Sequence, residues 1–418
     1  MEINTGDTAW VLASAALVMF MTPGLALFYG GMVRTKNVLA MLMQNFVCLG
    51  IVSVLWAVAL YSLAFSGDGD LIGNLDLAWM HDTLKTSPTN IGLTVPPFAF
   101  FAFQLMFAII TPALISGAIA DRMRFAAWMW FVPLWVLLVY TPVAHWVFSP
   151  EGWLFKRGAL DFAGGTVVHI NAGIAALAAV LVLGKRRGWP QHPMVPHNLP
   201  LTLIGAGILW FGWFGFNAGS ALGGNELAAT ALVNTQLAAA AALVSWLLVE
   251  RLRTGHATTL GAASGLVAGL VAITPCAGFV GGMAPIYIGL IAGAVCAFAV
   301  SLKFKFGYDD SLDVVGVHLV GGLIGSLLVG VFADAAFNAG VAAAPGGGGL
   351  IETGSFDLLL EQLLAVAVTM AWSFIITGVI MLVLKKALPQ GIRASEEDEE
   401  TGLDLTQHSE TGYALDRV

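Results

Sequence analysis

The sequence contains little charge for its length. Asp, Glu, Lys and Arg together make up 11% of its 418 residues, whereas soluble domains average about 25% charged residues. Water is therefore not the main solvent of this chain, and an ordinary soluble globular protein is excluded. The net charge of -8 provides no basic surface for nucleic acid, and we expect no nucleic-acid partner.

Cysteine is scarce as well. Cys48, Cys276 and Cys296 are scattered through apolar stretches, and they form neither a CxxC pair nor any other metal-ligand spacing. We interpret them as packing residues, and we expect no metal and no cofactor. The first seven residues lack the basic segment that begins a signal peptide, so we do not expect a cleaved signal.

Long apolar runs, in contrast, recur along the whole chain. Hydrophobic residues make up 58% of the sequence, and a helix needs roughly 20 apolar residues to cross a bilayer. The 49 glycines and 13 tryptophans are typical of close helix packing and of anchoring at the membrane interface. We predict an all-α, polytopic membrane protein with eleven transmembrane helices. The predicted spans cover residues 9–33, 37–66, 96–120, 124–146, 160–184, 199–222, 227–249, 259–279, 282–302, 312–333 and 357–384.

The basic residues indicate how these spans are oriented. An odd number of spans places the two ends of the chain on opposite sides, and Lys and Arg collect in cytoplasmic loops. With the N-terminus outside, all but three of the 18 basic residues lie in inner loops or in the C-terminal tail. The exceptions are Lys85, Lys156 and Arg157. We therefore predict a multi-pass protein of the plasma or inner membrane, with its N-terminus outside and its C-terminus in the cytoplasm.

The chain divides into two regions by composition. Residues 1–388 contain all the apolar runs and are predicted to form the transmembrane channel or transporter domain. Residues 389–418 are polar and include an acidic run from Glu396 to Glu400. We predict that this second region is a cytoplasmic regulatory tail. The loop 67–95 carries several aspartates and is predicted to lie outside.

Two halves of the membrane domain share short motifs at an offset of five spans. The matching positions are Thr111-Pro112 with Thr274-Pro275, Asp161 with Asp313, His169 with His318, and Gly173 with Gly322. Because five is odd, the two halves insert in opposite directions. This pattern predicts an inverted repeat of spans 1–5 and 6–10, with a site between the halves and span 11 as an addition.

A histidine lies inside each of spans 5 and 10. His169 and His318 enter from opposite faces and reach towards the midplane, where a polar side chain is a functional candidate by default. A neutral imidazole has one donor and one acceptor, so the two rings can bond to each other and handle a proton or a small weak base such as an amine. The alternatives are two separate histidines that only pack in the core or, with less support, a metal site.

Other polar and aromatic residues surround these spans. Asp161 and Asp313 begin spans 5 and 10, and we expect both to cap a helix; Asp161 also favours an incoming cation. Aromatic residues crowd spans 3 and 6, where a few of them can form a cation–π site. The members of this group are Phe100, Phe101, Phe103, Phe107, Trp210, Phe211, Trp213, Phe214 and Phe216.

Several segments around these residues match a known family. They are Asp-Phe-Ala-Gly-Gly-Thr-Val-Val-His-Ile-Asn at 161–171, Gly-Trp-Phe-Gly-Phe-Asn-Ala-Gly-Ser at 212–220, Phe-Gln-Leu-Met-Phe at 103–107, Gly-Val-His at 316–318, Ala-Leu-Phe-Tyr-Gly-Gly at 26–31 and Pro-His-Asn-Leu-Pro at 196–200. On these segments the chain resembles the ammonium transporter (Amt/Rh) family in its bacterial and archaeal form, and the likeness extends over essentially the whole sequence.

The resemblance implies a transporter rather than an enzyme. It implies that the protein recruits NH4⁺ at an outer aromatic site, deprotonates it and conducts NH3 through an apolar pore, with or without net transfer of the proton. The implied recruitment site comprises Phe107, Phe148, Ser220 and Asp161; the gate comprises Phe107 and Phe216; and the pore lining comprises His169, His318 and Trp213.

One position of the recruitment site departs from the family pattern. Many bacterial relatives have a tryptophan where this chain has Phe148. Because tryptophan is the better cation–π partner, the resemblance implies a weaker outer site. Trp146 is two residues away and is expected to face elsewhere on its helix.

The resemblance also implies partners. It implies a homotrimer with one pore per subunit, and a tail that couples the subunits and meets a trimeric PII signalling protein at the inner mouth. The tail segments that match are Gly391-Ile-Arg393, Gly402-Leu-Asp404 and Tyr413. The residues alone leave open a channel for a small neutral solute (a gas, urea or water), an ammonium sensor and a membrane enzyme, of which the last has no nucleophile or cofactor motif in its favour.

Overall fold

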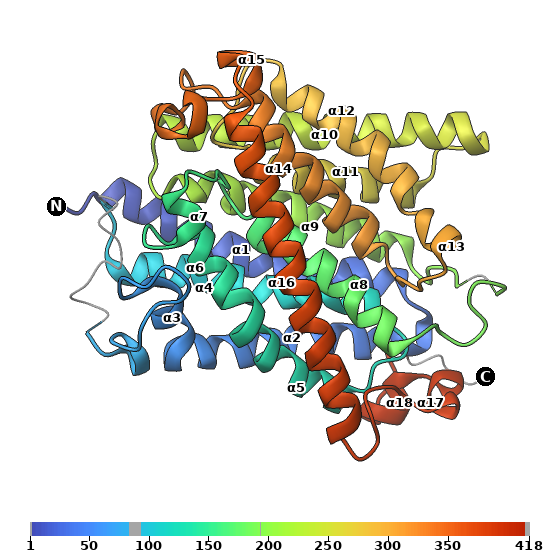
Figure 1. Cartoon of the computed structure of the whole chain (residues 1–418). Coiled ribbons are helices and arrows are strands. Elements are labelled where there is room, and N and C mark those ends of the chain that lie inside the picture. Colours follow the sequence, from blue (N-terminus) through green and yellow to red (C-terminus); the bar gives the residue numbers. More distant parts are fainter. Residues whose placement is uncertain (1, 83–92, 193, 414–418) are drawn as a thin grey trace.

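The computed structural model describes residues 2–82, 93–192 and 194–413. Residues 83–92 of the predicted outer loop and 414–418 of the predicted tail lie outside this description. Over the described residues the chain is helical and contains no named strand, only an isolated bridge between Met123 and Arg393. The N-terminus and the tail helices lie at opposite ends of the bundle (Figure 1). We call these ends the N-terminal face and the tail face.

Ten helices of the described chain are long and apolar enough to cross a membrane, and an eleventh apolar helix, α11 (Thr259–Ile273), is shorter. The prediction of an all-α polytopic membrane protein is confirmed, and the count of eleven spans is consistent with these helices. The ten are α1 (Thr5–Met32); α2 (Val38–Leu55) with η2 (Trp56–Leu60) and α3 (Tyr61–Phe65); α4 (Pro97–Ile119); α5 (Phe125–Trp135) with η4 (Val136–Tyr140) and α6 (Thr141–Phe148); η5 (Gly165–Ile170) with α8 (Asn171–Leu183); α9 (Leu199–Ala218); α10 (Glu226–Thr254); α12 (Ala284–Ala299) with α13 (Leu302–Phe306); η7 (Val315–Leu319) with α14 (Val320–Phe332); and α16 (Asp357–Ala387).

Short helices occupy the two faces. On the N-terminal face they are η3 (Ala78–Met80), α7 (Trp153–Lys156), η6 (Gly219–Ala221), η8 (Ala339–Ala343), η9 (Pro345–Gly347) and α15 (Leu350–Thr353), and on the tail face they are η1 (Thr35–Asn37), α17 (Glu396–Thr401) and α18 (Leu403–His408).

The pattern of α16 is that of a helix in lipid. Its polar side chains at Gln362, Thr369 and Ser373 are buried against the bundle, whereas Ile375 and Val383 on its other side are exposed. A soluble protein places these residues the other way round, because water favours the polar side chains. In Figure 1, α16 runs diagonally across the bundle from the N-terminal face to the tail face.

Glycine allows the two histidine-bearing segments to cross closely. A Cβ atom at Gly173, four residues after His169, would lie 2.4 Å from the backbone nitrogen of Leu319. A Cβ atom at Gly322, four residues after His318, would lie 3.0 Å from a side-chain carbon of Ile170. Gly173 therefore packs beside Leu319, the neighbour of His318, and Gly322 packs beside Ile170, the neighbour of His169. This reciprocal packing is consistent with the predicted repeat.

Aspartates fix the start of both segments. Asp161 accepts hydrogen bonds from the backbone N–H groups of residues 164–167, at 2.7–3.2 Å. On the other segment, Asp310 accepts from the N–H groups of Val314 and Val315, at 3.1 and 2.8 Å. Both aspartates stand eight residues before their histidine.

The prediction that Asp313 caps the second segment is therefore wrong. Asp313 has a left-handed backbone with φ 65°, and its carboxylate pairs with Lys303 Nζ at 2.6 Å instead of with the helix start. The counterpart of Asp161 is Asp310, which is buried. Burial raises the pKa of Asp310 to about 6, against the opposing charge of Lys303.

A buried ion pair holds connecting segments together on the tail face. Arg186, which follows α8, binds the carboxylate of Asp309 in a bidentate manner, with N–O distances of 3.0 and 2.8 Å. Burial alone would raise the pKa of Asp309, but the hydrogen bonds from Arg186 and the charge of Arg122 hold that pKa below its ordinary value. Pairing of this kind is required because an unpaired charge is costly to bury.

The tail packs against the tail face of the same chain. The backbone N–H of Ala394 donates to the carbonyl of Arg122 at 2.8 Å, and the carboxylate of Asp404 accepts from the N–H of Ala40 at 2.8 Å. The second bond satisfies an N–H group in the first turn of α2, where helices lack internal acceptors. The tail therefore supplies a hydrogen-bond acceptor to the first turn of a membrane-spanning helix.

Replacing Gly173 by Ala is expected to destabilise the protein. The added methyl group would overlap the backbone of Leu319, and overpacking of this kind costs about 1–3 kcal/mol. Thermal unfolding of the purified protein in detergent should show a lower midpoint for Gly173→Ala. The matched control is Gly378→Ala on α16, where a Cβ atom meets nothing within 4 Å. An equal midpoint for the two variants would show that the crossing is not tight.

Candidate functional site

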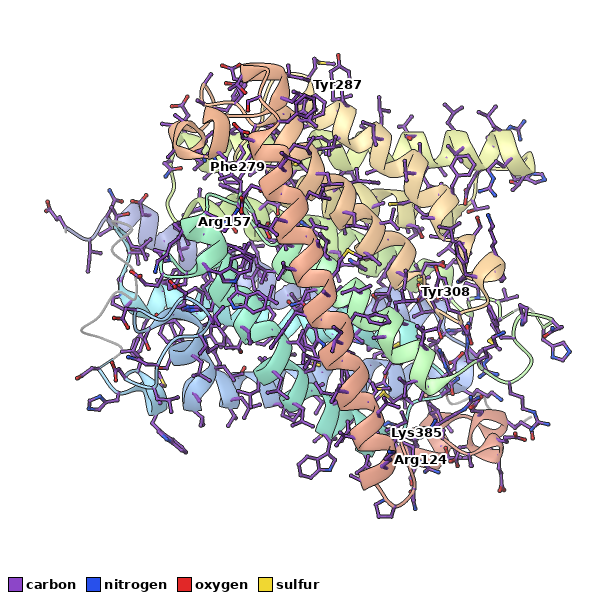
Figure 2. All side chains as sticks on the ribbon, viewed as in Figure 1. Arg124, Arg157, Phe279, Tyr287, Tyr308 and Lys385 are labelled. Atoms are coloured by element: carbon purple, nitrogen blue, oxygen red, sulfur yellow. The ribbon has the colours of Figure 1, made fainter. Side chains whose placement is uncertain are left out.

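A cavity of about 220 Å³ lies at the N-terminal face of the bundle. Four of its side chains come from one face of α4, and others come from α6, η6 and the loops on this face. Figure 2 labels Phe279, one of the lining residues, at the same end of the molecule as Arg157 and opposite Tyr308, Arg124 and Lys385. We call this cavity the cup. Its lining is Phe100, Phe103, Gln104, Phe107, Val147, Phe148, Phe155, Ala159, Leu160, Asp161, Phe162, Ser220, Leu222 and Phe279.

The four residues predicted for recruitment, Phe107, Phe148, Asp161 and Ser220, all line the cup. Ser220 Oγ donates its proton to the carbonyl of Phe216 at 2.8 Å, so its lone pairs are the part left for a ligand. Asp161 uses both oxygens on backbone N–H groups. Burial raises its pKa, and the bonds from those N–H groups lower it, with burial the larger effect.

Two stacked phenyl rings close the floor of the cup. The ring centroids of Phe107 and Phe216 are 4.3 Å apart, with the ring planes tilted by 39°. Phe107 lines the cup, whereas Phe216 lines a second cavity deeper in the bundle. The pair therefore forms the partition between the two cavities, which is the position predicted for a gate.

The two histidines meet directly below this partition. The Nδ1 atoms of His169 and His318 lie 3.3 Å apart, and the rings are nearly parallel at an angle of 19°. His169 also stacks on Trp213, with centroids 5.4 Å apart. Trp213 is fixed in turn, because its Nε1–H donates to Thr274 Oγ1 at 2.8 Å. The prediction that the histidines bond to each other agrees with this geometry.

The second cavity is narrow. It measures about 10 Å³, which is room for about one water-sized molecule. Only His169, His318 and Trp213 bring polar atoms to its lining. His169 is 1% exposed and His318 is 3% exposed, and Nε2 of His169 has no hydrogen-bond partner among the described residues. That nitrogen is available to a small molecule in the cavity.

The ring contact limits the protonation of the pair. Two Nδ1 atoms in contact share one proton, so one ring donates and the other accepts. The donor ring then has an acceptor at Nε2, and the acceptor ring has an N–H there. If both rings were charged, each Nδ1 would carry a proton and the bond would be lost. The contact is therefore incompatible only with the doubly charged pair, and in its neutral form the pair presents one donor and one acceptor to the cavity.

Sequence reasoning missed part of the cup. Phe155 comes from the short helix α7 and Phe279 from a loop, and no motif or helical periodicity marked them. Gln104 lies inside the matched segment 103–107, so its position was visible, but nothing in the sequence indicated that its side chain faces a cavity. Trp146, in contrast, is absent from the cup lining, and its Nε1–H donates to the carbonyl of Leu71 at 2.7 Å.

Comparison with known proteins places the chain in a family. The model of the Ammonium Transporter Family matches residues 9–413. This chain belongs to the ammonium transporter family. An ammonium transporter of Mycobacterium tuberculosis is 52% identical to it over 98% of this chain and 90% of the relative. For an ammonium transporter of Bacillus subtilis the identity is 49%, over 98% of this chain and 99% of the relative.

A solved structure gives the same assignment. The crystal structure of Candida albicans Mep2 superimposes with a TM-score of 0.88 at 36% identity, covering 95% of this chain and 88% of that one. The family comprises transporters rather than enzymes, in agreement with the absence of any enzyme motif noted above. Among the described residues no group of three or more His, Cys, Asp and Glu side chains is arranged to hold a metal ion.

Replacing Asp161 by Asn is expected to lower stability. One of the two acceptor oxygens is lost, and with it the bonds to the N–H groups of Thr166 and Val167. Hydrogen bonds to a charged group contribute about 1.5–3 kcal/mol each, so the midpoint of thermal unfolding should fall clearly. Glu151→Gln, which removes a charge from an exposed ion pair on the same face, should leave the midpoint almost unchanged. If Asp161→Asn also left it unchanged, the carboxylate would not act as a cap.

Proposed function

We propose that this protein transports ammonium across the membrane, taking up NH4⁺ at the cup and passing NH3 through the cavity that the two histidines line. The observation that carries the proposal is the order of these parts. Phe107 of the cup contacts Phe216, Phe216 contacts His169, and His169 contacts His318.

We propose that the ring faces of the phenylalanines in the cup attract the ion. Phenyl rings attract a cation through the negative face of the π system, by about 0.5–1 kcal/mol at exposed sites and more where water is removed. Phe107 and Phe148 supply two such faces, and the hydroxyl of Ser220 supplies an acceptor for an N–H group. We propose these residues, with Asp161 as the cap that shapes the entrance, as the recruitment site.

The ion gives up one proton to water on the cup side before it enters the narrow cavity, and that proton either stays outside or is relayed separately from the ammonia. A charge there would lie among apolar side chains with no counter-ion, at a cost of several kcal/mol or more. Ammonia is neutral and small, and it can both accept and donate a hydrogen bond at the Nε2 positions of the histidines. K⁺ has no proton to release and is excluded. Trp213 and His318 complete the lining of this path.

The double variant His169→Ala/His318→Ala is expected to abolish selective ammonium transport. It removes the hydrogen-bonding groups of the path and widens it, so the current evoked by ammonium pulses should be lost or become permeable to K⁺. The measurement uses proteoliposomes on a solid-supported membrane. His256→Ala, at an exposed residue in the loop after α10, is the matched control. A double variant with wild-type currents and intact K⁺ rejection would overturn the proposal.

We further propose the membrane orientation and assembly that the sequence predicts. The N-terminal face, with the cup, is the outer side, and the tail face is the cytoplasmic side of the plasma or inner membrane.

The apolar side chains exposed on α9, α10 and α12 suit both lipid contact and a homotrimer. The tail, residues 389–418, is the regulatory segment and the contact for a PII-type signalling protein.

Deletion of residues 389–418 is expected to reduce binding of a PII-type protein. The acidic helix α17 and Asp404 support the loops of the tail face, so their removal disorganises the surface on which such a partner would bind. A pull-down with a trimeric PII protein compares the truncated and full-length chains in detergent. The single variant Glu397→Gln, at an exposed position of α17, serves as control. Equal recovery of PII with the truncated chain would contradict the assignment.

A further inference from the structure

Gln104 is a polar side chain inside the cup that none of the roles above uses. It lies on α4 one turn before Phe107, and residues three or four apart share a face of a helix. Phe100, Gln104 and Phe107 therefore all line the cup. The side chain of Gln104 is 9% exposed, so it is nine-tenths buried at the wall of the cavity.

The amide oxygen of Gln104 has no hydrogen-bond partner among the described residues, although it is buried. This distinguishes it from the other polar groups of the cup, because Asp161 accepts four backbone bonds and Ser220 donates one. Buried acceptors in folded proteins almost always have a donor. The side chain lines the cup while its oxygen is buried and unpaired, so a ligand in the cup could supply the missing donor if the amide turned towards it.

The ammonium ion has the complementary chemistry. It carries four N–H donors and no acceptor, and it gives up bonds to water when it enters the cup. Phenyl faces offset its charge, but they provide no lone pair along an N–H direction. A carbonyl oxygen does, and hydrogen bonds to a charged partner are about twice as strong as those between neutral groups. The proposal requires a half-turn of the amide about its last bond, which exchanges the positions of its nitrogen and oxygen.

We propose that Gln104 is a recognition residue of the cup, whose amide oxygen accepts a hydrogen bond from the recruited ammonium ion. The proposal rests on the proposed transport of ammonium and adds a specific acceptor to it. With Ser220, the cup then provides two acceptors and a set of phenyl faces.

The test compares Gln104→Leu and Gln104→Glu with the wild type in the proteoliposome assay. Loss of the acceptor in Gln104→Leu should raise the half-saturating ammonium concentration about tenfold. That factor corresponds to a loss of roughly 1.4 kcal/mol of binding free energy. The maximal current should stay within about twofold, because the path below the cup is unchanged. Gln104→Glu keeps an acceptor oxygen and should hold the half-saturating concentration at or below the wild-type value.

Thermal unfolding separates recognition from a structural role. Because the oxygen has no partner in the fold, replacement of Gln104 by Leu should leave the unfolding midpoint unchanged or raise it. Gln44→Leu is the matched control, since Gln44 is another buried glutamine, on α2, that does not line the cup. Its half-saturating ammonium concentration should equal that of the wild type.

Each other outcome overturns a different statement. A wild-type half-saturating concentration in Gln104→Leu, alongside a lost current in the double histidine variant, would reject the role of Gln104 and leave the proposed transport intact. A fall in both midpoint and current in Gln104→Leu, without rescue in Gln104→Glu, would also reject it in favour of a structural role. Absence of an ammonium current in the wild type would reject the proposed transport itself.

Discussion

The close crossing of two helical segments brings the histidines together, and the site depends on it. His169 and His318 reach each other because Gly173 and Gly322 leave room for the opposite backbone and side chains at the crossing. Asp161 and Asp310 fix where each segment begins, eight residues before its histidine. A shift of either segment by a fraction of an ångström would break the 3.3 Å contact between the rings, because hydrogen bonds weaken steeply with distance and angle.

The position of the crossing also explains how charge is distributed through the molecule. Charged groups such as Arg186 and Asp309 are paired and kept at the tail face, and the aspartate nearest the cup is used as a helix cap. Among the described residues, the lining of the second cavity includes no Asp, Glu, Lys or Arg. Under the proposed transport, a medium of low dielectric constant at this place favours a neutral molecule over an ion. In that proposal, selection against charge depends on the surroundings as much as on the two histidines.

The sequence predicted much of this arrangement, for reasons that can be traced to particular residues. Length and apolar composition predicted the spans, because the bilayer allows little besides a helix about 20 residues long. The equal spacing of His169 with Gly173 and of His318 with Gly322 indicated a duplicated pair. The choice of Asp313 as the second cap failed, because a sequence lists nearby aspartates without showing which backbone N–H groups each can reach. Asp310 accepts those bonds, and Asp313 turns to Lys303 instead.

By itself, therefore, the sequence determined that the chain is an all-helical membrane protein of the ammonium transporter type and that two histidines lie within its spans. Both are properties of composition, periodicity and local motif. Only the tertiary structure decided that Phe155 of α7 and Phe279 of a loop line the cup and that Phe107 and Phe216 separate two cavities. It also decided that the oxygen of Gln104 has no partner among the described residues. The physical reason is that cavities and unpaired polar atoms are produced by packing between segments far apart in the chain, and no local pattern contains that information.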